Sequence, residues 1–182
     1  LLAEPAASAI METVALHRNR ATIVLDPNVR PALIKDRDDY LKRLDAWLTL
    51  SHLVKISSQD IRWLYPERSF ADIAQEYLAK GVKALIITQG EKGASLYRIG
   101  HEVLFVPSVR VEVVDTVGAG DTFTGTLMRK LLDFGPIESL AEDDWREVIR
   151  EASLAAAFNC ARAGANPPTT QELSHFKTLN SQ

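Results

Sequence analysis

The chain has 182 residues, of which 46% are apolar and 25% are charged, an ordinary composition for one medium-sized globular domain. Its formal net charge is -3, and its Lys and Arg residues are scattered, which argues against a nucleic-acid partner. The single cysteine, Cys160, excludes an internal disulfide framework, and no apolar run approaches the ~18 residues of a membrane span, so we expect a cytoplasmic protein with no membrane partner.

Helix and strand patterns alternate along the first half of the chain. Apolar residues that recur every three or four positions predict helices, and short β-rich runs predict strands between them. The expected helices are Ala3–His17, Asp39–Leu50, 58–65 (capped by Ser57 or Ser58) and Phe70–Lys80, and the expected strands are Ala21–Leu25, His52–Ile56 and Val82–Thr88. This order favours an α/β fold with a mainly parallel sheet.

The second half begins with strand patterns and ends with helices. Two short β runs joined at Gly100 predict an antiparallel hairpin, and a third run follows them. The expected strands are Gly93–Ile99, His101–Val106 and Val109–Val114. The expected helices are 119–134, a long one from a cap at Asp143 or Asp144 to Ala163, and one from Thr169 or Thr170 to about Leu179.

The stretch Asp115–Gly125 joins the last predicted strand to a helix. Gly118 and Gly120 permit unusual backbone dihedrals, so that consecutive N–H groups can converge on one point, and the helix adds its unpaired N–H groups and the positive end of its dipole. These groups predict an anion site. Asp121 would be repelled by a bound phosphate unless it takes up a proton, and a base beside an anion site suggests group transfer.

Other phosphate-binding motifs do not fit this stretch. The chain has no Gly-Lys-Ser or Gly-Lys-Thr, which excludes a P-loop. A dinucleotide fingerprint needs a third glycine where Phe123 stands, so a Rossmann dehydrogenase is disfavoured. The purely structural alternative is a glycine turn in which Asp121 caps the helix.

The stretch Asp115–Gly125 resembles, almost residue for residue, the C-terminal signature of the ribokinase-like (PfkB) carbohydrate kinases, and the chain is most similar to the bacterial fructokinases among them. Further segments resemble the family in the same order: Asp26–Arg30, Val54–Ser57, Thr88–Gly93 and Arg162–Pro168. The resemblance implies a three-layer α-β-α ribokinase-like fold with a mainly parallel sheet. It also implies that residues 1–182 are the C-terminal part of a single kinase domain, with the nucleotide site and the catalytic loop but without the N-terminal half and the lid. The start without Met agrees with this expectation. The full-length protein is expected to form a homodimer.

The resemblance assigns roles to the residues of the stretch and to its neighbours. It implies that Asp121 is the general base and that the backbone of Gly118, Ala119 and Gly120 holds the transferred phosphoryl group. It places Asn28 and Arg30 near the substrate or phosphate, although Asp26-Pro27-Asn28 by itself predicts a plain turn. The nucleotide, ATP, is expected at Lys55, Thr88, Gly90, Gly93 and Asn159.

Two metal ions are implied. Asp60 lies where the family has an acidic residue associated with Mg²⁺, which we expect to be held through water, and the alternative is a capping box with Ser57. Potassium, K⁺, would be held by backbone carbonyl groups around Asp115, Val117, Asn159, Arg162 and Gly164. Lys55 can equally be a solvated lysine, and Gly90 and Gly93 can serve as turn residues. The histidines, Cys160 and the tryptophans are interpreted as structural.

The function expected from these features is ATP-dependent phosphorylation of a sugar hydroxyl, in a fructokinase-like enzyme. The alternatives are a kinase for 2-keto-3-deoxygluconate, ribose or a nucleoside, and a non-catalytic nucleotide-binding module that keeps the fold. The fragment alone is expected to bind ATP without turning over a sugar, because most sugar contacts would lie outside it.

Overall fold

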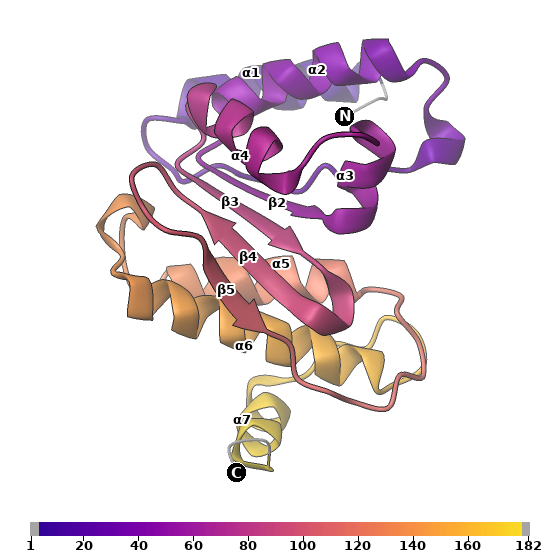
Figure 1. Cartoon of the computed structure of the whole chain (residues 1–182), viewed down its shortest axis with the longest axis vertical. Coiled ribbons are helices and arrows are strands. Elements are labelled where there is room, and N and C mark those ends of the chain that lie inside the picture. Colours follow the sequence, from indigo (N-terminus) through magenta and orange to yellow (C-terminus); the bar gives the residue numbers. More distant parts are fainter. Residues whose placement is uncertain (1–3, 180–182) are drawn as a thin grey trace. The chain divides into compact units, whose positions relative to one another are not determined.

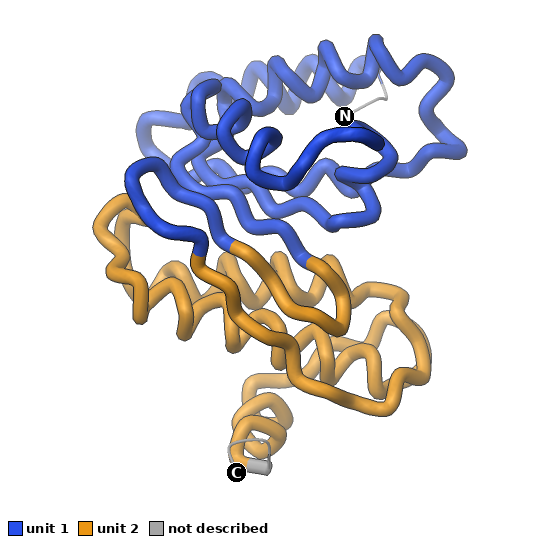
Figure 2. The backbone as a smooth tube through the Cα atoms, in the orientation of Figure 1, with its two compact units in different colours: residues 1–88, 96–103 blue, residues 89–95, 104–182 orange. Residues whose placement is uncertain are grey.

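The computed structural model describes residues 4–179 (Figure 1). The chain forms two compact units (Figure 2): unit 1 comprises residues 1–88 and 96–103, and unit 2 comprises residues 89–95 and 104–182. Ala3, the predicted start of the first helix, lies outside the described residues. That residues 1–182 are part of a single kinase domain stays a prediction.

Helices and strands alternate in unit 1 as the sequence predicts. Its elements are α1 (Ala6–His17), β1 (Val24–Leu25), α2 (Arg37–Leu50), β2 (Leu53–Ser57), α3 (Ser58–Leu64), α4 (Phe70–Ala79) and β3 (Ala84–Thr88). Strand β4 (Gly93–Tyr97) has residues in both units. Unit 2 contains β5 (Leu104–Pro107), α5 (Ala119–Leu131), α6 (Glu142–Cys160) and α7 (Thr170–Leu179).

The strands form a five-stranded sheet in the order β1-β2-β3-β4-β5. Strands β1, β2 and β3 are parallel, and the register of β2 and β3 runs from Leu53 opposite Ala84 to Ser57 opposite Thr88. The N–H of Ser108, just after β5, donates to the carbonyl of Lys92, just before β4 (3.4 Å), which is the arrangement of a hairpin. The predicted mainly parallel α/β sheet is confirmed.

The core of unit 1 lies around β2 and β3. Both strands are buried along four consecutive residues, and such continuous apolar runs are typical of parallel strands that are covered on both faces. Trp47 of α2 lies in this core, while Trp63 is only partly buried against it. Each of three helices begins at a side chain that accepts a hydrogen bond from the first turn, and these caps are Asp36, Ser57 and Ser69.

Unit 2 is built around the pairing of α5 with α6 (Figure 1). The buried face of α5 carries Phe123, Leu127 and Leu131, as the helical spacing predicts. Trp145 begins the buried face of α6 and is fully enclosed. Helix α6 also contacts β5 and α7, so it connects the other elements of unit 2.

The predicted strand Val109–Val114 is wrong. In the described structure this segment pairs with no strand, and the side chains of Val113 and Val114 are more than half exposed. The backbone N–H groups of Val114 and Asp115 instead donate to the carbonyl of Cys160 at the end of α6, at 2.8 and 3.2 Å. A β-rich composition makes a strand only where a neighbouring strand accepts its backbone groups.

Two further boundaries differ from the prediction. Only Val24 and Leu25 of the predicted strand Ala21–Leu25 are paired. Helix α6 has Ala141 at its N-cap, and Asp144 accepts from the N–H of Ala141 (2.9 Å) instead of capping the helix itself. None of the helices in the described part combines the length and hydropathy that a membrane span requires.

Candidate active site

The turn before α5 adopts the conformation that its glycines allow. Gly118 is the N-cap of α5 with a φ of 78°. A β-carbon there would lie 2.7 Å from the β-carbon of Ala165, so both the backbone conformation and the close approach require glycine. The N–H of Ala119 donates to Thr116 (3.2 Å), which closes the turn.

The turn presents unpaired donors beside a carboxylate. Within the described part of the chain, the N–H groups of Gly118, Gly120 and Asp121 have no hydrogen-bond acceptor. The side chain of Asp121, in the first turn of α5, is exposed and has no partner among the described residues. Three donors at the positive end of a helix can bind an anion, and the free carboxylate next to them can accept a proton.

Two side chains attach this turn to the loop that follows α6. One oxygen of Asp115 accepts from the N–H of Val117 (3.0 Å) and the other from the N–H of Gly164 (2.9 Å). These two hydrogen bonds hold the pKa of Asp115 below its ordinary value. The amide of Asn159, which is fully buried, donates to the carbonyl of Val117 (2.8 Å) and accepts from the N–H of Asn166 (2.9 Å).

The predicted K⁺ ligands therefore lie together in unit 2, and two of their carbonyl groups already accept hydrogen bonds, that of Asn159 from the N–H of Arg162 (3.1 Å) and that of Val117 from the amide of Asn159 (2.8 Å). The carbonyl of Val117 accepts one hydrogen bond, which leaves one lone pair for a cation. The guanidinium of Arg162 pairs with Glu172 (2.6 Å) and lies over the ring of Phe158, 3.9 Å from its centre. Together with Thr169, Arg162 lowers the pKa of Glu172 to about 2. The cation site stays a prediction.

In unit 1, Lys55 and Asp26 form a buried ion pair. The ammonium nitrogen lies 2.9 Å from a carboxylate oxygen of Asp26, and the two side chains are 5% and 16% exposed. The other carboxylate oxygen accepts from the N–H of Asn28 (3.2 Å), whose φ of 44° is unusual for a residue other than glycine. Lys55 is thus neither solvated nor free, and it is tied to the turn that carries Asn28.

Asp60 lies close to this ion pair in unit 1. Ser57 caps α3 by accepting from the N–H of Asp60 (3.0 Å), as the capping alternative predicts. Burial raises the pKa of the Asp60 carboxyl, and the charge of Asp26 raises it further. Burial, with a smaller contribution from the charge of Asp60, raises the pKa of Tyr40 to about 12.

A half-buried carboxylate of this kind fits a divalent cation whose other ligands are phosphate oxygens and water. No cluster of three or more metal-ligating side chains occurs among the described residues, so the phosphates would have to complete the site.

The remaining predicted residues lie at the ends of strands. Arg30 and Asn28 follow β1 and are exposed, and the Arg30 guanidinium donates to the carbonyl of Val29 (3.2 Å). Thr88 ends β3. A β-carbon at Gly93 would lie 2.1 Å from the carbonyl oxygen of Val106, so packing alone accounts for that glycine.

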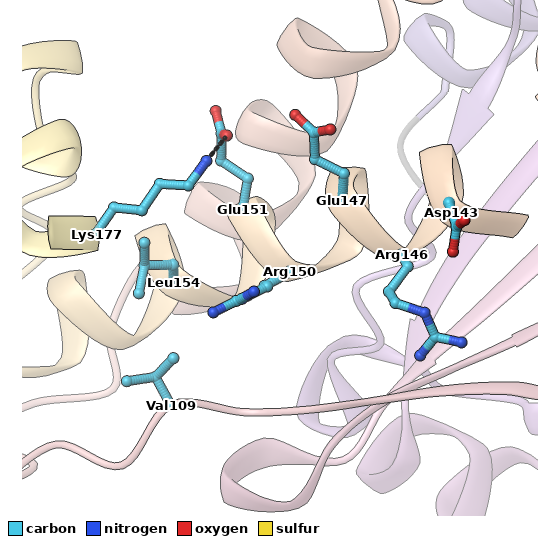
Figure 3. A pocket seen from close by; sticks show the side chains of 8 residues that line it. All are labelled: Val109, Asp143, Arg146, Glu147, Arg150, Glu151, Leu154 and Lys177. Atoms are coloured by element: carbon cyan, nitrogen blue, oxygen red, sulfur yellow. Dashed lines mark hydrogen bonds and ion pairs between the residues drawn. The ribbon is translucent and has the colours of Figure 1, made fainter. Parts of the chain in front are cut away.

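A pocket of about 300 Å³ in unit 2 contains none of the predicted site residues (Figure 3). Charged side chains line most of it: Asp143, Arg146, Glu147, Arg150 and Glu151 of α6, and Lys177 of α7. Lys177 is paired with Glu151 (3.3 Å), and both signs of charge are present around the pocket.

Comparison with known families decides the assignment. The family described as pfkB family carbohydrate kinase matches residues 1–172. The chain belongs to this family. The pfkB resemblance of the Asp115–Gly125 stretch is thereby confirmed, and the strand-end segments of unit 1 lie within the matched range.

Individual relatives of this pfkB chain include fructokinases. A fructokinase of Rhizobium leguminosarum bv. trifolii is 42% identical over 109 residues, which is 60% of this chain and 33% of the relative. The structure of a fructokinase of Xylella fastidiosa with bound ATP has a TM-score of 0.87 at 22% identity, over 97% of this chain and 58% of the other.

A third relative is a ribokinase II candidate of E. coli in complex with ATP and Mg²⁺. Its structure has a TM-score of 0.81 at 25% identity, over 98% of this chain and 56% of the other. The likeness in structure confirms the ribokinase-like fold. The chain thus spans between a third and about three-fifths of the length of these relatives.

Sequence reasoning missed several residues that shape the pfkB site. The sequence predicts Asp26 only as part of a turn and of a family segment, although it pairs with Lys55. Ala165 and Asn166 were included only as part of a family segment, although they contact Gly118 and Asn159. No local signal identifies these contacts, because each joins residues that are distant in the sequence.

Proposed function

We propose that the chain carries the phosphoryl-transfer site of an enzyme that phosphorylates a sugar hydroxyl with ATP, in the manner of a fructokinase. The observation that carries the proposal is the exposed, unpartnered carboxylate of Asp121 beside the free N–H groups of Gly118 and Gly120. The sugar hydroxyl oxygen attacks the γ-phosphorus of ATP, the bond to the β-phosphate breaks, and ADP leaves. Asp121 accepts the hydroxyl proton, and the N–H groups stabilise the charge on the transferred group.

The residues of unit 1 have supporting roles in this proposal. Arg30 is the candidate ligand for a phosphate oxygen, because its exposed planar guanidinium can bind two oxygens at once. Asp60 is the candidate that holds Mg²⁺ through water. Thr88 and Gly90 are the proposed nucleotide contacts. When bound, the magnesium ion supplies charge neutralisation of the phosphates. A K⁺ ion held by backbone carbonyl groups around Val117 belongs to the same proposal.

What the relatives bind, and the activity they are named for, supports the proposed substrates ATP and fructose. The Xylella fastidiosa fructokinase binds ATP, and the E. coli ribokinase II candidate binds ATP with Mg²⁺. The Rhizobium leguminosarum bv. trifolii relative is a fructokinase at 42% identity, which favours fructose over ribose. A kinase for 2-keto-3-deoxygluconate, ribose or a nucleoside, or a nucleotide-binding module without activity, remains the alternative.

The test is ADP release by the complete protein over a panel of fructose, ribose, 2-keto-3-deoxygluconate and nucleosides. We expect turnover with fructose and a decrease in kcat of about 10²–10⁴-fold in Asp121→Asn, the range that a general base contributes. Asp143→Asn is the matched control, since Asp143 is also an exposed acid in the first turn of a helix, and it should change kcat less than about twofold.

Three outcomes separate the proposal from its alternatives. Equal rates for the wild-type protein and Asp121→Asn would overturn the role of Asp121. Preference for another member of the panel would replace fructose as the substrate. ATP binding with no turnover on any sugar would favour the nucleotide-binding module.

A further inference from the structure

Asn159 is a buried side chain whose amide bonds two separate segments of unit 2. It lies in the last turn of α6 and is 0% exposed. Its Nδ2 donates to the carbonyl of Val117 (2.8 Å), and its Oδ1 accepts from the N–H of Asn166 (2.9 Å). A buried amide is costly unless it is hydrogen-bonded, so these two bonds define where both segments lie relative to α6.

The segment before α5 depends on such bonds because it is not part of the sheet. Residues 109–114 pair with no strand in the described structure, and the segment is attached instead to the end of α6 through the carbonyl of Cys160. Asp115 adds a second link, to the N–H of Gly164. Asp115 and Asn159 each bond the turn and the loop at the same time, and Asn159 does so from within α6 with a fully buried side chain.

The loop held by Asn159 lies directly against Gly118. A β-carbon at Gly118 would lie 2.7 Å from the β-carbon of Ala165 and 3.6 Å from Oδ1 of Asn159. A shift of residues 164–166 or of Val117 would therefore move Gly118. The N–H groups of Gly118 and Gly120 have no acceptor in the described part, so the direction in which they point depends on the bonds that hold the rest of the turn, including the bond from Asn159 to Val117.

We propose that Asn159 is a positioning residue that orients the anion-binding turn Val117–Gly120. This inference rests on the proposed function, in which the turn stabilises the transferred phosphoryl group. It differs from the role implied by the family resemblance, in which Asn159 contacts the nucleotide. Both polar groups of the side chain bond the protein backbone, so Asn159 acts on the rate of transfer and not on the affinity for ATP.

The first experiment compares Asn159→Leu with Asn166→Ala in the complete protein. Leucine has a similar size and can make neither hydrogen bond. Asn166 contributes only its backbone N–H and its side chain is exposed, so the alanine variant keeps the bond and is the control. We expect kcat to fall about 10- to 100-fold in Asn159→Leu, because misplacing an anion-stabilising donor by about an ångström costs this much. The KM for ATP should stay within about twofold.

A double-mutant cycle with Gly118→Ala provides a readout that general destabilisation does not change. Both substitutions displace the same turn, so the double variant should lose much less activity than the product of the two single losses. Multiplicative losses would overturn the inference, as would an increase in the KM for ATP with kcat preserved. Should Asn159→Leu fail to fold, the same cycle is measured with Asn159→Asp, which keeps the side-chain size and can accept from Asn166 but cannot donate to Val117 when ionised.

Titration with inorganic phosphate tests the role of Asn159 without requiring turnover. The amide NMR signals of Gly118, Gly120 and Asp121 should shift on adding phosphate to the wild-type protein, with about tenfold weaker affinity in Asn159→Leu and no change in Asn166→Ala. Equal affinities in all three proteins would overturn the role of Asn159. If the wild-type protein phosphorylates no sugar, the proposed function fails, and the titration still decides whether Asn159 orients the turn.

Discussion

The buried pair of Lys55 and Asp26 leads to a quantitative prediction. Removing one partner of a buried ion pair leaves an uncompensated charge and costs about 3–5 kcal/mol. Asp26→Asn leaves the Lys55 ammonium, 5% exposed, without its counter-charge, so we expect a loss near the upper end of this range. Lys55→Met leaves a carboxylate that is 16% exposed and still accepts from the N–H of Asn28, so we expect a loss near the lower end, about 3 kcal/mol.

The double variant Asp26→Asn/Lys55→Met contains neither charge. Replacing a buried ion pair by uncharged groups is often close to neutral, so the double variant should lose less than either single variant. Independent losses of about 5 and 3 kcal/mol would add to about 8 kcal/mol, and because the double variant should lose less than about 3 kcal/mol, the coupling energy of the cycle is expected to exceed about 5 kcal/mol.

Urea unfolding of the complete protein measures these differences in stability. The midpoints can be compared if the slope of the unfolding free energy against urea concentration is the same in all variants. Asp45→Asn is the control, because it removes an acid from the more exposed pair with Lys80 and should cost less than about 1 kcal/mol. The structural role of the ion pair would be refuted if both single variants unfolded at the wild-type urea concentration and Lys55→Met raised the KM for ATP. Lys55 would then bind phosphate instead of holding Asp26.

Two further predictions concern Asp60 and Gly93. Because the folded-state pKa of Asp60 is raised, its ionised form opposes folding, and this cost appears as the pH rises through the folded pKa. Asp60→Asn should therefore flatten the fall in thermal midpoint between pH 4 and 7. The same variant should weaken the dependence of activity on Mg²⁺. An unchanged pH dependence would contradict this assignment. Gly93→Ala places a β-carbon 2.1 Å from the carbonyl oxygen of Val106 at a φ of 126°, so it should lower the free energy of unfolding in urea by about 2–4 kcal/mol. Gly100→Ala, with no atom within 4 Å of the added β-carbon, is the control and should cost only about 1 kcal/mol. Equal losses in the two variants would rule out the clash.

Local features of the fold were predictable because their causes are local. Short continuous apolar runs identified β2 and β3, and the serine before α3 was recognisable as a cap from its position. The segment Val109–Val114 has an equally strand-like composition but has no strand beside it in the described structure. Whether a β-rich run becomes a strand depends on a partner elsewhere in the chain, which composition does not reveal.

In the candidate site, too, the features with local causes were predictable and those that depend on distant residues were not. The free donors around Gly118 and the nearby carboxylate of Asp121 follow from glycine geometry and helix ends, which act over a few residues. The partner of Lys55 is 29 residues away, and the bond from Asn159 to Val117 spans 42 residues. Such pairings depend on the tertiary fold, so the sequence alone left Lys55 between a phosphate ligand and a solvated lysine, and neither alternative anticipated its ion pair.

The local motif and the tertiary contacts contribute differently to the chemistry of the site. The motif Gly118-Ala119-Gly120-Asp121 supplies the groups that phosphoryl transfer needs, but a donor stabilises developing charge only when it is held in the correct direction. In this chain that direction depends on a loop with Ala165 in contact with Gly118 and on the amide of Asn159. A replacement of Ala165 should therefore change the rate of transfer without altering the motif itself. A chain that keeps the motif but has a bulkier residue at the position of Ala165 should be a poorer catalyst, because the added atoms would press on Gly118.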